Sequence, residues 1–208
     1  MIIIGLTGSI AMGKSITAKI FSSIGVPVFD ADYCVHELMG INGKLVPAIA
    51  KEFPESLEKI KNNKYINRVK LGNIVFKNNI MKRKLENIIH PQVGKERKKW
   101  TEWATRQRYK IICYDIPLLF ETKGEKSCDE VVVVSAPSLI QKQRALKRKN
   151  MDLKKFNNIL KTQMSDAEKR KRSDFIVNSG NGYRFSRNQV ENIIKKLFII
   201  QLGQLHGL

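Results

Sequence analysis

The sequence predicts an α/β fold in which a parallel β-sheet is flanked by helices, and three observations support this class. Short apolar runs rich in β-branched residues alternate with segments of helical length. A glycine-containing motif joins the first apolar run to the first helical segment. The chain has 208 residues, of which 42% are hydrophobic. That is enough to bury one substantial core but hardly two independent ones.

Five strands are expected in the sheet, because five β-branched apolar runs are bounded by turn or helix signals. These runs cover residues 2–6, 26–29, 110–114, 130–134 and 175–177. Since a helical segment separates each run from the next, the strands should lie parallel with helices on both faces.

Local signals bound the predicted helices. Residues 14–24 should form a helix that stops at Gly25. Residues 85–103 have the pattern of a long amphipathic helix, in which Pro91 and Gly94 could mark a break between two shorter ones. After the fourth strand, Ser135 can cap a helix with Pro137 in its first turn.

The charge of the chain is high and unevenly distributed. It carries 38 Lys and Arg against 19 Asp and Glu, a formal net charge of +19. Residues 58–110 hold 16 basic and 4 acidic residues and residues 142–172 hold 12 and 3, whereas the remainder holds 10 and 12. Nucleic acid is the first partner such a charge suggests, with a membrane surface second, although solvated helix faces explain many single lysines equally well. A nearly neutral frame therefore carries two basic inserts.

Cysteines, histidines and apolar runs exclude several classes of protein. Cys34, Cys113 and Cys128 form no CxxC pair, and the three histidines are too scattered to indicate a metal site. No apolar run reaches the roughly 18 residues of a membrane span, and residues 1–6 lack the features of a signal peptide. We therefore expect a cytoplasmic protein that is neither a disulfide scaffold nor a zinc module.

A phosphate-binding loop is the strongest motif in the chain. Residues 8–15 read GSIAMGKS, which fits GxxxxGK[ST] between a predicted strand and a predicted helix. Backbone N–H groups of residues 11–16 would converge on phosphates at the positive end of the helix. Lys14 would reach the β and γ phosphates, and the Ser15 hydroxyl would ligate Mg²⁺. The motif predicts a nucleoside triphosphate site.

Three aspartates follow predicted strands in the layer where open α/β sheets bind ligands. Asp30 and Asp32 follow the second strand, and either could accept the proton of a hydroxyl that attacks the γ phosphate. Asp30 is also a good N-cap for a helix over residues 33–38, and Asp32 a weaker one. Asp115, at the end of the third strand, is either a carboxylate near Mg²⁺ or a satisfied strand-end group.

Together these motifs resemble those of the dephospho-CoA kinase family. The resemblance begins with the phosphate loop, Asp30-Ala31-Asp32 and the DIPLLFE segment at 115–121, and it extends over residues 2 to about 180. Its further positions are Asn67-Arg68, Leu71, Val75-Phe76, Leu85-Glu86, His90-Pro91, Asp129, Gln143-Arg144, Arg148, Gln163-Met164, Asp174 and Asn178.

The resemblance implies a P-loop kinase core at residues 1–32, 111–141 and 173–208, a helical CoA-substrate-binding insert at 33–110, and a helical lid at 142–172. These two inserts contain the basic segments. The implied activity is transfer of phosphate from ATP, with Mg²⁺, to the ribose 3′-hydroxyl of dephospho-CoA, the last step of CoA biosynthesis. The implied protein is a monomer or weak homo-oligomer without a nucleic-acid or membrane partner.

Carried over position by position, the resemblance assigns roles to individual residues. Asp32 is implied as the catalytic base, with Lys14 and the lid residue Arg144 as the other catalytic groups. Ser15 and Asp115 are implied as the Mg²⁺ ligands. The implied nucleotide-binding residues are Gly8, Ala11, Met12, Gly13, Lys14, Ser15, Ile16 and Arg148.

Substrate contacts are implied for Arg68, His90, Pro117 and Leu118. Two of these residues have a structural alternative. Arg68 could instead anchor the start of a helix, and His90-Pro91 could break a helix with the imidazole bonded to backbone.

The phosphate loop departs from the usual family pattern, GGxGSGKST. Ser9, Ala11 and Met12 replace two glycines and a serine, and Ile16 replaces a threonine. Ala11 is tolerable at a negative φ, whereas a positive φ would cost on the order of 1 kcal/mol. Ile16 removes a hydroxyl that the family often places on the α phosphate. We therefore expect weaker ATP binding with activity retained.

Two other functions compete with this interpretation. Another small-molecule kinase, for nucleoside or nucleotide acceptors, would share the loop, base and lid but not the combination of DAD, HP and DIPLLFE. A nucleic-acid-binding P-loop protein would explain the charge but should carry a basic stripe with interleaved aromatics. Trp100 and Trp103 lie three residues apart on one predicted helix face, a spacing more typical of core.

The apolar run 197–208 could pack on the frame or on another subunit.

Overall fold

The structure is a computed structural model that describes residues 1–75 and 78–205, with side chains described through residue 199. Phe76, which contributes to the resemblance, and the end of the apolar run 197–208 lie outside the described residues. The chain forms two compact units. The core unit comprises residues 1–29 and 104–208, and the insert unit comprises residues 30–103.

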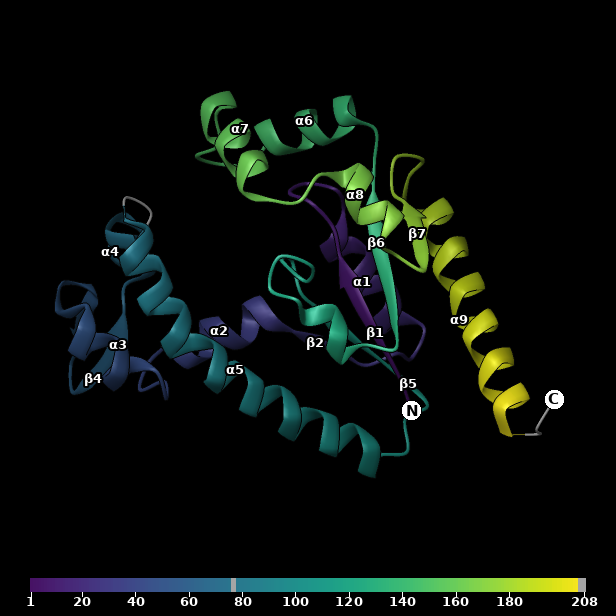
Figure 1. The fold of residues 1–208 in the computed structure, drawn as a ribbon. Helices are drawn as coiled ribbons and strands as arrows, with labels where there is room; N and C mark the ends of the chain where they lie inside the picture. Colours follow the sequence, from purple (N-terminus) through teal and green to yellow (C-terminus); the bar gives the residue numbers. More distant parts are fainter. Residues whose placement is uncertain (76–77, 206–208) are drawn as a thin grey trace. The chain divides into compact units, whose positions relative to one another are not determined.

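A five-stranded sheet in the order β2-β5-β1-β6-β7 forms the centre of the core unit (Figure 1). β1 pairs in parallel with both β5 and β6, and β6 pairs in parallel with β7. The predicted parallel sheet is confirmed, and each strand begins and ends within two residues of its expected limits. The strands are β1 (Ile2–Thr7), β2 (Val28–Asp30), β5 (Ile111–Asp115), β6 (Glu130–Ser135) and β7 (Phe175–Asn178).

Helices pack on this sheet through short apolar faces. The helix after the phosphate loop, α1 (Lys14–Ser23), buries Thr17, Ala18, Ile20 and Phe21. Its C-cap is Ile24, and Gly25, with a φ of 86°, ends the helical turn as expected. The C-terminal helix α9 (Tyr183–Leu205) packs against α1 and β7. Leu197, the first residue of the apolar run, is fully buried in this core. The remaining helical segments of the unit are η2 (Gly124–Ser127), α6 (Ser138–Leu146), α7 (Leu153–Thr162) and α8 (Asp166–Lys171).

The insert unit has its own apolar cluster, which includes Leu38, Ile49 and Phe53. Its elements are α2 (Ala31–Met39), α3 (Val46–Glu52), η1 (Pro54–Ser56), β3 (Leu57–Ile60), β4 (Asn63–Ile66), α4 (Arg68–Val75) and α5 (Asn79–Arg106), whose last turn lies beyond the unit. The antiparallel β3–β4 hairpin was not expected in an insert predicted to be helical. Its strands are short and partly exposed, so they carry little of the apolar alternation that identifies strands.

The long helix α5 is continuous through Pro91 and Gly94, so the predicted break is wrong (Figure 1). Proline removes one backbone hydrogen bond from a helix interior. Apolar residues on both sides of it, including Leu85 and Val93, pack into the insert's cluster. This packing offsets the lost bond and holds the helix together.

Two further expectations are corrected. Ser135 does not cap the following helix, because it ends β6 and its hydroxyl donates to Asp166 Oδ2 at 2.7 Å. Pro137 occupies the N-cap position of α6 without a side-chain cap. Trp100 and Trp103 pack on each other, with ring centroids 5.9 Å apart, but Trp103 is 39% exposed and is not a core residue.

No described helix is both long and apolar enough to cross a membrane. Among the residues that the structure describes, the three cysteines form no disulfide.

Candidate active site

The phosphate loop joins β1 to α1 in the core unit. Gly8 passes so close to β6 that a Cβ on it would lie 2.7 Å from the Val134 carbonyl oxygen. Gly13 has a φ of 99° and is the N-cap of α1, where no described side chain caps the helix. The N–H groups of the first turn, including those of Lys14 and Ser15, are therefore available to an anion.

Ala11 adopts the strained alternative, since its φ is 61°. Its methyl group is nevertheless buried, in an apolar cluster with Ala145 of α6 and Phe156 of α7. The departure from glycine thus gives the loop a packing contact with the predicted lid. Ile16, in contrast, is 52% exposed.

Lys14 and Asp115 form the closest ion pair at the loop, with 2.6 Å between Nζ and Oδ1. Asp115 ends β5 opposite Leu6 of β1, so the sheet register brings it to the start of the loop. The Asp115 side chain is only 3% exposed, and the lysine offsets the cost of burying its charge.

Oxygen ligands at this position suit Mg²⁺. The cation is usually held by one or two protein oxygens together with phosphate oxygens and water. The Ser15 hydroxyl, at the start of α1, and the Asp115 carboxylate offer that donor set. The residues present therefore fit a magnesium ion shared with a nucleotide.

Two glutamines, Gln141 of α6 and Gln163 of the predicted lid, hold the other end of the loop. Gln163 Oε1 accepts from the Ile10 N–H at 3.0 Å, and Gln141 Nε2 donates to the Ile10 carbonyl at 2.9 Å. The Met12 sulfur accepts from the Ala136 N–H at 3.2 Å. The sequence marked Gln163 only as part of the resemblance and gave no signal for Gln141, because neither contact is local in the chain.

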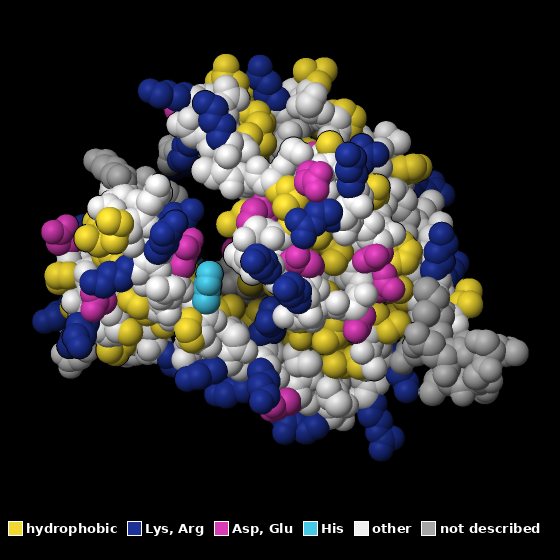
Figure 2. All heavy atoms as spheres, in the orientation of Figure 1, with side chains coloured by type: hydrophobic (Ala, Val, Ile, Leu, Met, Phe, Trp, Pro, Cys, Tyr) yellow, Lys and Arg dark blue, Asp and Glu magenta, His cyan; other side chains and the backbone are white. Residues whose placement is uncertain are grey.

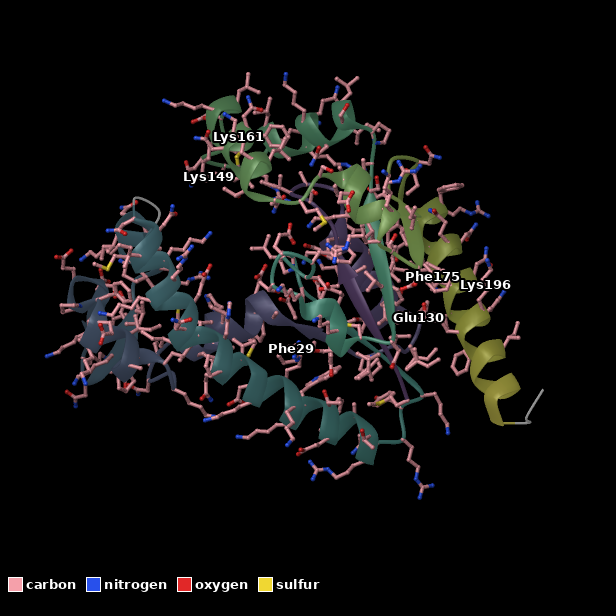
Figure 3. All side chains as sticks on the ribbon, viewed as in Figure 1. Phe29, Glu130, Lys149, Lys161, Phe175 and Lys196 are labelled. Carbon is pink, nitrogen blue, oxygen red and sulfur yellow. The ribbon has the colours of Figure 1, made fainter. Side chains whose placement is uncertain are left out.

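Arg144 lies beside the loop and is not a solvated lid charge. Its Nη1 donates to Ser179 Oγ at 2.8 Å and its Nη2 to the Ser179 carbonyl at 2.9 Å. Ser179, which the sequence did not single out, in turn donates to the Met12 carbonyl at 2.6 Å. Arg148 lies in the exposed turn after α6, next to Lys149 (Figure 3).

The segment after β5 is fixed through Pro117. The Pro117 carbonyl accepts from Thr7 Oγ1 at 2.9 Å and from Lys169 Nζ at 3.4 Å. Lys169 is fully buried and pairs with Glu121 Oε1 at 2.9 Å. Leu118, the next residue, is 37% exposed.

The two aspartates at the junction of β2 and α2 have different structural roles. Asp30 is the N-cap, and its Oδ1 accepts from the Tyr33 N–H at 2.9 Å. Asp32 is exposed in the first turn of the helix. Capping therefore accounts for Asp30 and does not account for Asp32.

A pocket of about 540 Å³ lies within the insert unit. Its lining is His36, Met39 and Gly40 together with residues 65–69. Arg68 is the exposed first residue of α4, but the helix is capped by Asn67, whose Oδ1 accepts from the N–H groups of Val69 and Lys70 at 3.0 and 3.1 Å. The anchor of this helix start is Asn67, and Arg68 is one of the residues that line the pocket.

His90 is exposed on α5 and does not line this pocket. The helix continues through Pro91, so the interpretation of His90-Pro91 as a helix break is wrong.

A family model described as dephospho-CoA kinase matches residues 2–184. The chain belongs to the dephospho-CoA kinase family. The kinase is 48% identical to the dephospho-CoA kinase of Bartonella henselae over 197 residues, which are 95% of this chain and 98% of the relative. It is 44% identical to that of Bradyrhizobium diazoefficiens, over 95% of this chain and 96% of the relative.

Solved structures agree with this family. A Thermus thermophilus protein superposes with a TM-score of 0.80 at 27% identity, and a Campylobacter jejuni dephospho-CoA kinase with a TM-score of 0.64 at 27% identity. Each comparison covers 94% of this kinase and 96% of the other chain. A shikimate kinase from Acinetobacter baumannii, with a TM-score of 0.53 at 16% identity over 97% of this chain and 96% of its own, supports the fold alone.

Proposed function

We propose that this kinase transfers the γ-phosphoryl group of ATP to the ribose 3′-hydroxyl of dephospho-CoA, which yields coenzyme A in the last step of its biosynthesis. The observation that carries the proposal is the Lys14–Asp115 pair, 2.6 Å apart, at a phosphate loop between β1 and α1. In this pair, Lys14 supplies a cation for the phosphates and Asp115 a carboxylate for a metal ion. Both groups are what a kinase of this family needs.

The phosphate loop binds the nucleotide through backbone groups and Lys14. Residues 8–16 surround the phosphates, and the Lys14 ammonium donates to the β and γ phosphate oxygens. Ser15 and Asp115 would hold Mg²⁺, which when bound would neutralise charge on the same phosphates. Arg144, already beside the loop, donates to the transferring group, and Arg148 adds a second cation from the lid.

Asp32 accepts the proton of the attacking hydroxyl. It follows the last residue of β2 by two positions, and ligands of open α/β sheets bind beyond the carboxyl ends of the strands. A carboxylate at this position can take up that proton as the new P–O bond forms. Asp30 keeps the helix start in place.

The dephospho-CoA substrate binds through Arg68, His90, Pro117 and Leu118. Arg68 presents a guanidinium in the pocket of the insert unit, where it suits a phosphate group of the substrate. Pro117 and Leu118 lie on the segment that Thr7 and Lys169 hold in place. The protein acts in the cytoplasm as a monomer or weak homo-oligomer, a state that light scattering after gel filtration would measure.

The proposal is tested by ADP release in the presence of dephospho-CoA. Lys14→Ala should abolish detectable turnover, because the lysine neutralises charge on the β and γ phosphates. The change also removes the ammonium that pairs with the buried Asp115 carboxylate, so turnover is measured at a temperature where circular dichroism shows the variant folded. Lys19→Ala, an exposed lysine on the same helix, is the matched control and should keep wild-type turnover. Wild-type rates in Lys14→Ala would refute the nucleotide site.

The two aspartates give a second test. Asp32→Asn should lower kcat by roughly 10² to 10⁴, the usual contribution of a general base, with little change in ATP binding. Asp30→Asn should leave kcat close to wild type, because asparagine is also a good N-cap. The opposite ranking would assign the base to Asp30.

A further inference from the structure

Ser179, in the turn after β7, connects the phosphate loop to Arg144. The side chain is 7% exposed. Its hydroxyl donates to the Met12 carbonyl at 2.6 Å and accepts from Arg144 Nη1 at 2.8 Å. A hydroxyl has one proton and an arginine only donates, so the direction of both bonds is fixed by the chemistry of the groups.

The backbone of Ser179 is fixed as well. Its N–H donates to the Ser135 carbonyl at 2.8 Å, in line with the pairing of β6 and β7, and its carbonyl accepts from Arg144 Nη2 at 2.9 Å. Arg144 is therefore held at two nitrogens by one rigid residue. Such a two-point contact fixes the plane of the guanidinium, which a single contact would not.

This contact places the guanidinium at the start of α1. A Cβ built on Gly13 would lie 2.9 Å from Ser179 Oγ and 3.6 Å from Arg144 Nη1. Gly13 directly precedes Lys14, the lysine of the phosphate loop. The arginine and the loop thus share one support, and that support is the Ser179 hydroxyl.

We propose that Ser179 is a positioning residue for phosphoryl transfer, whose hydroxyl ties Arg144 to the Met12 carbonyl and orients the guanidinium beside the phosphate loop. The inference rests on the catalytic role proposed for Arg144. Without the hydroxyl, Arg144 keeps its charge and its bond to the Ser179 carbonyl, but it loses the second contact that fixes the plane of the guanidinium. The loss affects the step in which charge shifts on the transferring group.

Ser179→Ala should lower kcat about tenfold, the scale of one hydrogen bond to a charged group, with less than a twofold change in KM for ATP. Ser186→Ala is the matched control in the same unit. Ser186 is 3% exposed, and its hydroxyl donates to the Gly182 carbonyl at 2.9 Å. That variant should shift the melting temperature but leave kcat unchanged. A tenfold rise in KM with unchanged kcat in Ser179→Ala would overturn the proposal.

A double-mutant cycle separates positioning of Arg144 from support of the loop. Adding Ser179→Ala to Arg144→Ala should slow transfer by less than twofold, because there is no guanidinium left to orient. Single-turnover transfer of labelled phosphate keeps the slow variants measurable. An equal cost of Ser179→Ala in both backgrounds would show that the serine acts through Met12, and it would refute the inference while leaving the function intact.

The proposed function and the inference fail in different ways. A wild-type rate of transfer in Arg144→Ala would show that the arginine has no role in transfer. That result would refute the inference about Ser179 but not the proposed function, which Lys14→Ala tests. If Ser179→Ala does not fold, Ser179→Cys keeps the shape of the side chain, replaces a strong acceptor by a weak one, and is measured against the same outcomes.

Discussion

At the scale of single residues, Ala11 combines a left-handed backbone with a buried methyl group. A φ of 61° costs an alanine about 1 kcal/mol relative to glycine. Burying one methyl group contributes about 0.8 kcal/mol, and alanine restricts the unfolded chain by a further ~0.4 to 1 kcal/mol. The two favourable contributions match or exceed the strain, which explains how the loop tolerates this residue.

Ala11→Gly should therefore destabilise the protein by no more than about 1 kcal/mol, a fall in Tm of roughly 2 to 4 °C for a chain of this size. Thermal unfolding followed by circular dichroism measures the change. Ala145→Gly, on helix α6 in the same cluster, is the control, and it should cost more because no strain is relieved. A rise in Tm for Ala11→Gly would show that strain exceeds packing.

Ile16→Thr should lower KM for ATP a few-fold. The added hydroxyl can bond a phosphate oxygen, which is on the order of 1 kcal/mol or about fivefold in affinity. Ile16 is 52% exposed, so little apolar burial is lost and the Tm should change little. Ile16→Val, without a hydroxyl, is the control. Unchanged ATP affinity at unchanged Tm would mean that this loop holds phosphates in a different geometry.

At the scale of elements, Glu58 on β3 joins the hairpin to the start of α4. It accepts from the Tyr65 hydroxyl, from Asn67 Nδ2 at 2.7 Å, and from Lys70 Nζ at 3.1 Å. These bonds, first of all the one from Tyr65, lower the pKa of Glu58 from 4.5 to about 2. The same bond raises the pKa of Tyr65. Because Asn67 also caps α4, Glu58 supports the position of Arg68.

This pKa shift predicts a pH dependence of stability. A carboxyl whose pKa is lower in the folded state stabilises the protein above its unfolded pKa, and the contribution disappears as pH falls through the folded value. The Tm difference between wild type and Glu58→Gln should therefore be constant above about pH 5 and shrink between pH 4.5 and about 2. Glu55→Gln, at an exposed position of η1, is the matched control. A Tm difference independent of pH would contradict the role of this carboxylate.

Elements with local signals could be predicted from the sequence, and elements that depend on distant contacts could not. The five strands, the phosphate loop, the stop at Gly25 and the cap at Asp30 rest on apolar pattern and backbone preference. The continuity of α5 through Pro91 rests on packing by residues on both sides of it.

The same distinction applies within the site. The motif placed Lys14 at the nucleotide phosphates, and the position of Asp115 at the end of the third strand made it a candidate for the same site. Ser179 lies 35 residues from Arg144 and 167 from Met12, so its bonds leave no trace in local sequence. The prediction that Ser135 caps a helix is wrong for the same reason, because the carboxylate that its hydroxyl bonds, Asp166, lies 31 residues away in the chain.

At the scale of the whole molecule, a net charge of +19 requires a physical account. Figure 2 shows lysine and arginine side chains dispersed among hydrophobic and uncharged ones on the face drawn. Part of the charge lies on α7 and the turn before it, as Lys149 and Lys161 illustrate (Figure 3). A compact substrate pair that carries several phosphates needs cations at a few points and not along a track.

We therefore predict weak DNA binding at about 150 mM salt, because binding that depends on phosphate contacts weakens steeply with salt. Fluorescence anisotropy with a labelled duplex, titrated with salt, measures this. Tight, sequence-independent binding at that salt, competed by ATP, would instead support a nucleic-acid-binding function.

Because Lys169 is fully buried, the reactivity of its side-chain amine can report when α8 and the segment after β5 come apart. Amine acylation needs a solvent-accessible neutral nitrogen, and Lys169 Nζ is enclosed between Glu121 and the Pro117 carbonyl. Exposed lysines should react with an acylating reagent at once, whereas Lys169 should react only when α8 separates from the segment after β5. Peptide mass mapping over a time course would then give the opening rate of the segment that carries Pro117 and Leu118.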